Sequence, residues 1–165
     1  MKGFIPGSWF SKEKTAQNNQ FQFKIDRSNI TILVVDDSRT QVYATKKALE
    51  EFGFKVVTAE NGKHGILSAR HNRPDLIIMD IVMPEVNGFQ ATRYLTRHPE
   101  TSHIPIIIVS GSTQEADKAW GLKLGARDFL TKPTEPALLI TKVIRQLQAS
   151  QDATAFAAGE SKQVI

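Results

Sequence analysis

The stretch 74–88, PDLIIMDIVMPEVNG, joins a short apolar run to a single acid and a turn. Residues 76–79 have the length and composition of a strand that is buried on both faces of a parallel sheet. Asp80 follows at the carboxyl end of this strand, and the Met-Pro and Asn-Gly pairs after it indicate a turn. Ligands of open α/β sheets bind at the carboxyl ends of the strands, so Asp80 is a candidate site residue. Asp is also common at turns for structural reasons, and this stretch alone leaves both interpretations open.

The same alternation of apolar runs and amphipathic stretches extends over most of the chain. Short apolar runs predict strands, and the stretches between them, bounded by caps, Gly or Pro, predict helices. This alternation is typical of a doubly wound α/β fold, here a five-stranded parallel sheet with five helices on its two faces and right-handed crossovers. We expect strands at 30–35, 54–58, 76–79, 104–109 and 126–130, and helices at 38–52, 62–73, 89–98, 113–124 and 135–148.

The length of 165 residues suits one domain with an extension at each end. Residues 29–148 contain all of the predicted strands and helices. Residues 1–28 mix Gly, Pro, Ser, Gln and Asn with scattered aromatic residues, so we expect a flexible N-terminal extension. Residues 149–165 are small and polar, and we expect a disordered C-terminal tail.

The composition excludes several classes of site. The sequence has no Cys, which excludes disulfides, thiolate metal sites and Cys nucleophiles. Its 21 Lys and Arg residues are dispersed among 17 Asp and Glu residues, so the net charge of +4 indicates a solvated surface and no binding of DNA. No apolar stretch approaches the roughly 20 residues of a membrane span, and the first residues lack the apolar region of a signal peptide. We expect a cytoplasmic protein with no membrane insertion.

Five polar side chains fall at or just past the predicted strand ends. Asp36 and Asp37 follow the first strand, Asp80 the third, Ser110 the fourth, and Lys132 lies just past the fifth. Parallel strands end at the same edge of a sheet, so these side chains should meet there. Three carboxylates repel one another unless a cation neutralises them, and a ligand set of oxygens suits Mg²⁺. The hydroxyl and the ammonium group would then complete a pocket for a phosphoryl group.

Such a pocket supports phosphoryl transfer to Asp80. An ionised carboxylate is a nucleophile for phosphate and needs no general base, because it has no proton to lose. A metal ion and Lys132 would lower the barrier by positioning and by neutralising charge. The acyl phosphate would hydrolyse in time, which makes the modification a timed switch.

Residues 30–148 resemble the receiver domains of two-component response regulators. The resemblance is carried by the pair Asp36-Asp37, by Asp80 in MDIVMPEVNG, by Ser110 in IIIVSGS and by the run FLTKP, which contains Lys132. It implies a phosphoacceptor role for Asp80, and that Lys132 and Ser110 contact the phosphoryl oxygens. The bond between Lys132 and the following Pro would be cis, as it is in the family.

The resemblance also implies a metal site and a switch. Asp37, Asp80 and the backbone carbonyl of Val82 would bind Mg²⁺ directly, whereas Asp36 would act mainly through bound water. Phe129 would move inward when the Ser hydroxyl is drawn toward the phosphate, although a Phe on a strand is also ordinarily packed in the core.

The predicted helix 113–124 contains Trp120, for which we favour packing against the sheet over contact with a partner, because aromatic residues at helical spacing are usually in the core.

Within the family, residues 79–96 and 100–133 resemble single-domain receivers of a chemotaxis-like pathway that controls type IV pili and twitching motility. This implies a CheA-like histidine kinase as phosphodonor and a downstream protein that binds the region 113–148, from the fourth helix through the fifth strand to the fifth helix. A phosphate sink for a shared kinase is the alternative to an output regulator. Two features depart from the resemblance: the extension 1–28, and Gly111, a small residue that would alter the access of water to the phosphoryl group.

Two other classes of protein fit less well. A metal-dependent phosphohydrolase of the haloacid dehalogenase type would also use Asp80 as nucleophile, but such enzymes place a second acid two residues later, where this sequence has Val82. A transcription factor would need a DNA-binding segment, and the sequence after the fifth predicted helix has no helix-turn-helix pattern. We therefore predict a signalling protein that is not an enzyme.

Overall fold

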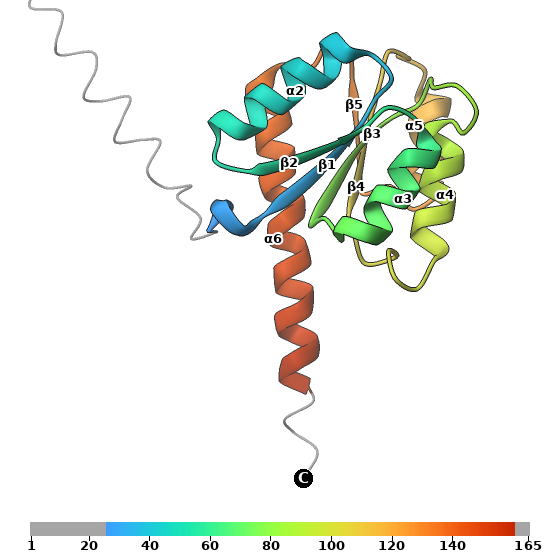
Figure 1. Cartoon of the computed structure of the whole chain (residues 1–165). Helices are drawn as coiled ribbons and strands as arrows, with labels where there is room; N and C mark the ends of the chain where they lie inside the picture. The colour runs from blue at the N-terminus through green and yellow to red at the C-terminus, as the bar shows by residue number, and fades with distance from the viewer. Residues whose placement is uncertain (1–25, 161–165) are drawn as a thin grey trace, which may run out of the picture.

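The computed structural model describes residues 26–160 (Figure 1). Five parallel strands form one sheet in the order β2-β1-β3-β4-β5. This is the doubly wound arrangement that the sequence predicts. The strands are β1 (Thr31–Val35), β2 (Lys55–Ala59), β3 (Leu76–Asp80), β4 (Ile106–Ser110) and β5 (Asp128–Thr131).

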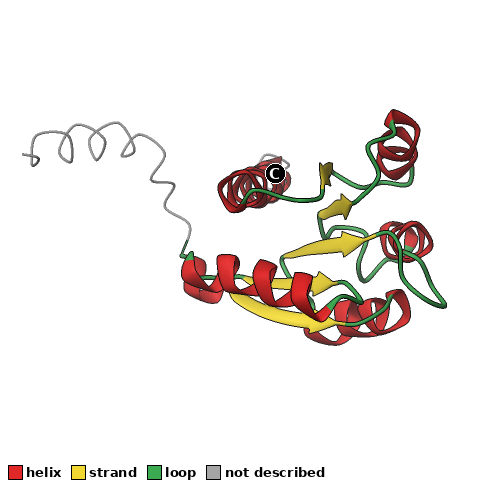
Figure 2. Ribbon diagram, turned by 90° about the horizontal axis from the view of Figure 1, so that it is seen from above, coloured by secondary structure: helices red, strands yellow, loops and turns green. Residues whose placement is uncertain are grey.

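Helices cover both faces of the sheet (Figure 2). The two helices α2 and α6 lie on one face, and α3, α4 and α5 lie on the other (Figure 1). A short 3-10 helix, η2, precedes β1 and begins beside Asp26, whose side chain accepts a hydrogen bond from the backbone of Ser28. The bounds are η2 (Arg27–Asn29), α2 (Arg39–Glu51), α3 (Gly62–Asn72), α4 (Gly88–Arg97), α5 (Glu115–Lys123) and α6 (Pro136–Glu160).

Each inner strand divides its side chains between two cores, because successive residues of a strand point to opposite faces. In β1, Ile32 and Val34 belong to the core beneath α2 and α6, whereas Leu33 and Val35 belong to the core on the opposite face. All residues of β3 are buried. The apolar run that follows Pro74 therefore forms the two-sided strand expected from the sequence, and it holds Asp80 at its end.

The last helix is longer than predicted. We expected a disordered tail from residue 149, but α6 continues without a break to Glu160. The stretch 149–158 is rich in Ala, the strongest helix former, and contains neither Gly nor Pro. Residues 151–158 are exposed and project beyond the domain (Figure 1). Neither α6 nor any other helix within residues 26–160 is long and apolar enough to cross a membrane.

The other predicted extension lies mostly outside the described residues. Residues 26–28 belong to the capped turn at η2 and are not the flexible segment that we expected there. The prediction for residues 1–25 and for the end of the tail, 161–165, concerns parts of the chain that the structure does not describe.

Trp120 does not pack against the sheet, contrary to our expectation. The residue is 47% exposed, and the Nζ atom of Lys123 lies 5.7 Å from the centre of its ring. α5 meets the sheet at Gly121, where a Cβ atom would lie only 2.8 Å from Cδ1 of Ile108. Because the buried position of the helix is this Gly, the neighbouring Trp120 points outward.

Candidate functional site

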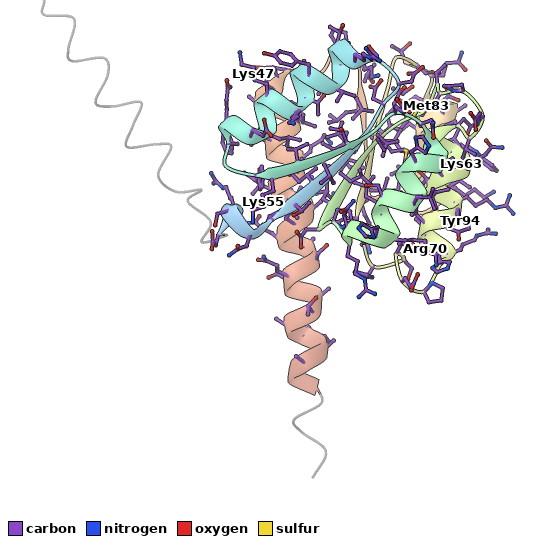
Figure 3. All side chains as sticks on the ribbon, in the orientation of Figure 1. Lys47, Lys55, Lys63, Arg70, Met83 and Tyr94 are labelled. Carbon is purple, nitrogen blue, oxygen red and sulfur yellow. The ribbon has the colours of Figure 1, made fainter. Side chains whose placement is uncertain are left out.

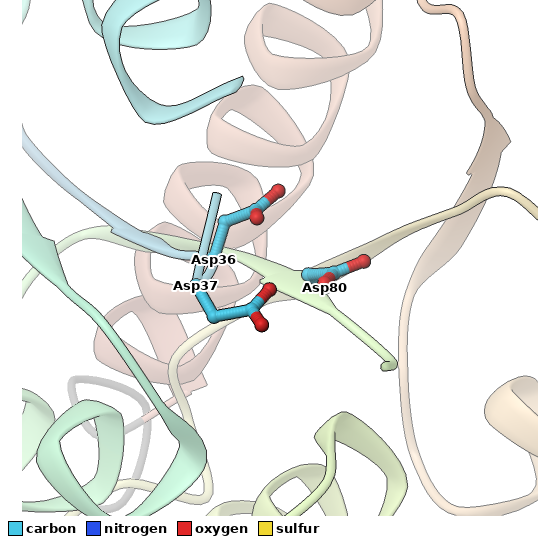
Figure 4. A group of neighbouring side chains, drawn as sticks. All are labelled: Asp36, Asp37 and Asp80. Carbon is cyan, nitrogen blue, oxygen red and sulfur yellow. The ribbon is translucent and has the colours of Figure 1, made fainter. Parts of the chain in front are cut away.

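The acids predicted from the strand ends meet at the carboxyl edge of the sheet. β1 and β3 are paired in register, with Val35 beside Met79, so Asp36 and Asp80 leave their strands side by side. Both residues are buried, with exposed fractions of 7% and 6%. Figure 4 shows their carboxyl groups and that of Asp37 gathered in one place. The fold thus produces a cluster of three carboxylates from two separate segments of the sequence.

The geometry of this cluster fits a divalent cation. One carboxylate oxygen from each of Asp36, Asp37 and Asp80 lies within 4.8 Å of the other two, and Asp37 is exposed to solvent. The carbonyl of Val82, in the loop after β3, accepts no backbone hydrogen bond from a described residue, and its role as a further ligand stays a prediction. A set of carboxylate and carbonyl oxygens suits a hard cation such as Mg²⁺. These residues could therefore hold the metal that the sequence predicts.

Lys132 connects the two buried acids. Its Nζ atom donates hydrogen bonds to Oδ2 of Asp36 at 2.7 Å and to Oδ1 of Asp80 at 3.0 Å. Lys132 follows β5, and its peptide bond to Pro133 is cis, as the resemblance implied. Burial lowers the pKa of Lys132, but the hydrogen bonds and charges of both acids outweigh it, so the pKa lies above its ordinary value of 10.5. Lys132 is therefore a permanent cation at neutral pH.

One ammonium group does not compensate fully for the buried acids. Burial is the main cause that raises the pKa of Asp80 above its ordinary value of 3.8, and the charge of Asp36 raises it further. The hydrogen bond from Lys132 acts in the opposite direction but does not cancel these effects. The remaining excess of negative charge is a physical reason for this edge of the sheet to attract a second cation.

The raised pKa of Asp80 leads to a prediction about stability and pH. Folded Asp80 binds its proton more tightly than Asp80 of the unfolded chain does. The stability that this tighter proton binding contributes is complete below the ordinary pKa and is lost as the pH rises through the folded pKa. At neutral pH without Mg²⁺, we expect Asp80→Asn to raise the melting temperature, because the uncompensated charge is removed. The gain should vanish in acid. Thermal unfolding of the wild type and the variant at neutral and at acid pH measures the effect. An equal gain in melting temperature at acid pH would contradict the electrostatic cause.

Ser110 and Phe129 lie on the neighbouring strands. Ser110 ends β4, is 2% exposed, and accepts a hydrogen bond at its Oγ atom from the backbone N–H of Ser112 at 3.1 Å. Its backbone carbonyl accepts a hydrogen bond from the N–H of Lys132 at 2.7 Å, which holds the two loops together. The ring of Phe129 is 8% exposed and belongs to the core beneath α3, α4 and α5. It is packed in this structure, and its role as a switch stays a prediction.

Two glycines near the site have opposite surroundings. At Gly88, the first residue of α4, a Cβ atom would overlap the backbone carbonyl oxygen of Asp80. The sequence marks Gly88 as a turn residue but gives no signal of this contact. At Gly111, a Cβ atom would meet nothing within 4 Å, so the space beside Ser110 is open.

The sequence also gave no signal for a contact that fixes β5. Lys142 of α6 donates to both carboxylate oxygens of Asp128, at 2.8 and 2.9 Å. This ion pair joins the last helix to the strand that leads to Lys132. The sequence does not predict this ion pair, because no regular spacing along the chain relates a residue of α6 to a residue of β5.

Comparisons with known proteins agree with this arrangement. The family described as the response regulator receiver domain matches residues 32–144. The chain is 53% identical over 112 residues to Protein PilH of Pseudomonas aeruginosa, and the match covers 68% of this chain and 93% of PilH. It is 37% identical over 112 residues to Response regulator PleD of Caulobacter vibrioides, which covers 68% of this chain and 25% of PleD.

A solved structure gives the same result for the fold. The structure is similar to that of the chemotaxis response regulator CheY4 of Vibrio cholerae, with a TM-score of 0.67 and 29% sequence identity. The match covers 71% of this chain and 98% of the CheY4 chain. The family match spans more than half of the sequence, and the fold and the acid cluster fall within it. The chain therefore belongs to the family of response regulator receiver domains.

Proposed function

We propose that the protein is a single-domain response regulator that accepts a phosphoryl group on Asp80 from a histidine kinase and signals by a conformational change. The observation that carries the proposal is the double contact of Lys132 with Asp36 and Asp80, beside the exposed carboxylate of Asp37. A cation and three acids at one sheet edge provide a nucleophile, a metal site and a charge to hold a phosphoryl group. Receiver domains take phosphate from histidine kinases, which supports the same chemistry.

In the proposed reaction, a carboxylate oxygen of Asp80 attacks the phosphorus of a phosphohistidine. A P–O bond forms while the P–N bond breaks, and its electron pair returns to the imidazole of the donor. Lys132 remains protonated and stabilises the added negative charge by hydrogen bonding. Asp37, Asp80 and the carbonyl of Val82 would hold Mg²⁺, with Asp36 acting through water, and the ion would supply positive charge that neutralises the phosphoryl oxygens.

The conformational signal would start at Ser110. Phosphorylation adds negative charge and acceptor oxygens at the sheet edge, to which the Ser110 hydroxyl can donate. In the unphosphorylated structure this hydroxyl accepts the N–H of Ser112, so its turn toward the phosphate would release the loop after β4. Phe129 would then repack, and α5, β5 and α6 would form the surface that binds a downstream protein. The exposed Trp120 lies on this surface.

The proposed pathway is a chemotaxis-like system in the cytoplasm that controls type IV pili and twitching motility, with a CheA-like kinase as phosphodonor. The 53% identity to PilH over 93% of its length supports this assignment. In such a system the protein would act either on a downstream target or as a phosphate sink that drains the kinase. The lifetime of the phosphoryl group separates these two roles, because a sink must lose its phosphate quickly.

Transfer from a purified CheA-like kinase tests the proposal. The kinase is first labelled on its His with radioactive ATP, freed of nucleotide, and mixed with the protein. We expect the label to move to the protein only when Mg²⁺ is present, because the acid cluster repels the phosphoryl group without a divalent cation. A kinase that keeps its label while Mg²⁺ is present would contradict the proposal. The decay of the transferred label then gives the phosphoryl lifetime.

A further inference from the structure

The cationic side chains are unevenly distributed among the helices. α3 and α4 together carry Lys63, Arg70, Arg93 and Arg97 and contain no Asp or Glu. The helices α2, α5 and α6 each contain residues of both signs. Along the sequence the basic residues are dispersed, and it is the packing of two acid-free helices side by side that concentrates them. The interpretation of the charge as an evenly solvated surface therefore does not hold for this face.

Arg93 and Arg97 of α4 line one hollow together with Tyr94. Figure 3 shows Lys63, Arg70 and Tyr94 on the same side of α3 and α4, away from Lys47 and Lys55. Tyr94 is 41% exposed, and its ring stacks on that of His98 with the centroids 5.5 Å apart. We call the set formed by Lys63, Arg70, Arg93, Tyr94 and Arg97 the basic face.

Most cations of the basic face form no ion pair with a described residue. Lys63, Arg93 and Arg97 are exposed and form no ion pair with any residue in the described range 26–160. Arg70 alone is paired, through a bond of 3.1 Å from its Nε atom to Oε2 of Glu100. In α2, by contrast, the neighbouring cations Lys46 and Lys47 are both paired with Glu residues one turn later. The basic face therefore keeps an uncompensated positive charge.

The Arg and Tyr side chains of the basic face favour an acidic protein segment as its partner. An Arg guanidinium binds a carboxylate through two parallel hydrogen bonds, and exposed Arg and Tyr together are typical of protein interfaces. The side chains of Gln90, Arg93, Tyr94, Arg97, His98 and Pro99 line a shallow hollow of about 410 Å³ beside the ring of Tyr94. A long polyanion such as DNA would also meet Glu60 and Glu100 at the ends of the face, which disfavours it.

We propose that the basic face binds a short acidic segment of a partner protein, with carboxylates on Lys63, Arg93 and Arg97 and an apolar side chain against Tyr94. This surface lies on α3 and α4, and not on the α5, β5 and α6 surface proposed for the phosphorylation-dependent target. Binding should therefore not require phosphate on Asp80, and it is separate from the function proposed above.

Backbone NMR shifts of the unphosphorylated full chain test the proposal. The probe is a synthetic helical peptide with Glu on one side and Leu beside it, compared with the same peptide carrying Gln for Glu, with duplex DNA and with phosphatidylglycerol vesicles. We expect the Glu peptide to shift amides of α3 and α4. The variant Arg93→Glu/Arg97→Glu should bind it at least about tenfold more weakly. The control Lys118→Glu/Arg127→Glu makes the same change in charge on exposed residues elsewhere and should keep the wild-type affinity.

Several outcomes would overturn the proposal. One is that the NMR shifts caused by the Glu peptide are absent or spread over the whole surface. Another is that the control variant weakens binding as much as Arg93→Glu/Arg97→Glu does, or that the Gln peptide binds as tightly as the Glu peptide. A third is that DNA or vesicles bind more tightly than the Glu peptide. The variant residues are exposed, and unchanged melting temperatures would show that each variant is folded. Because no kinase or phosphodonor is present, failure here says nothing about phosphorylation of Asp80.

Discussion

Replacing Asp80 by Asn is expected to reduce the incorporation of phosphate from acetyl phosphate by at least about a hundredfold, because an amide has no anionic oxygen to form the P–O bond. The neighbouring acids should not replace it. Both carboxylate oxygens of Asp36 already accept hydrogen bonds, Oδ2 from Lys132 and Oδ1 from the backbone N–H of Ser38 at 2.9 Å, whereas only Oδ1 of Asp80 is bound to Lys132. Asp37 lies on the exposed side of the cluster, where a metal ligand is needed. Intact-protein mass after incubation with acetyl phosphate and Mg²⁺ measures the effect.

A matched control removes one negative charge from the same region without touching the site. Glu85 is exposed in the loop after β3, and Glu85→Gln should incorporate phosphate at close to the wild-type rate. Thermal unfolding of both variants would show that they are folded. If Asp80→Asn gained as much acid-labile phosphate as Glu85→Gln, Asp80 would not be the phosphoacceptor.

Replacing Gly88 by Ala is expected to have the largest effect on stability. The new methyl group would overlap the carbonyl oxygen of Asp80, and backbone atoms cannot move aside as a flexible side chain can. The loop between β3 and α4 would have to shift, although the N–H of Gly88 is bonded to the carbonyl of Ile81 at 2.9 Å. We expect the free energy of unfolding to fall by about 1 to 3 kcal/mol, the typical range for overpacked positions. Urea unfolding measures this.

Gly111→Ala is the control for the effect of a methyl group as such. A Cβ atom there meets nothing within 4 Å, so its free energy of unfolding should change by less than about 0.5 kcal/mol. Gly88→Ala should also slow phosphorylation, since the displaced carbonyl belongs to Asp80. Equal stabilities of the two variants would show that the loop has room that the structure does not indicate.

The order of the elements and the place of the site followed from the sequence because both depend on strong local patterns. The apolar run before Asp80 has the length and the flanking Pro and Gly residues of a buried strand, and parallel strands end at one edge. This geometry predicts that Asp36, Ser110 and Lys132 lie together at that edge. The sequence pattern does not predict that Lys132 binds two acids directly, because these hydrogen bonds depend on where each loop places its side chain.

The features that the sequence did not predict depend on packing between elements. α6 continues past residue 148 on helix propensity alone, without the apolar stripe by which a helix is recognised. Trp120 is exposed because Gly121 takes the position nearest the sheet, and this choice follows from the space above Ile108. The sequence did not predict the basic face for the same reason, since Arg70 and Tyr94 are distant in the sequence and share a surface only through the packing of α3 on α4.

The most direct test of the central claim is to locate the phosphoryl group on the chain. Borohydride reduces an aspartyl phosphate to homoserine, and tandem mass spectrometry of the digested protein identifies the modified residue. After treatment with acetyl phosphate and Mg²⁺, we expect homoserine at position 80, and none when Mg²⁺ is removed by a chelator. Homoserine at position 36 or 37 instead, or at no position, would contradict the assignment of Asp80 as the phosphoacceptor.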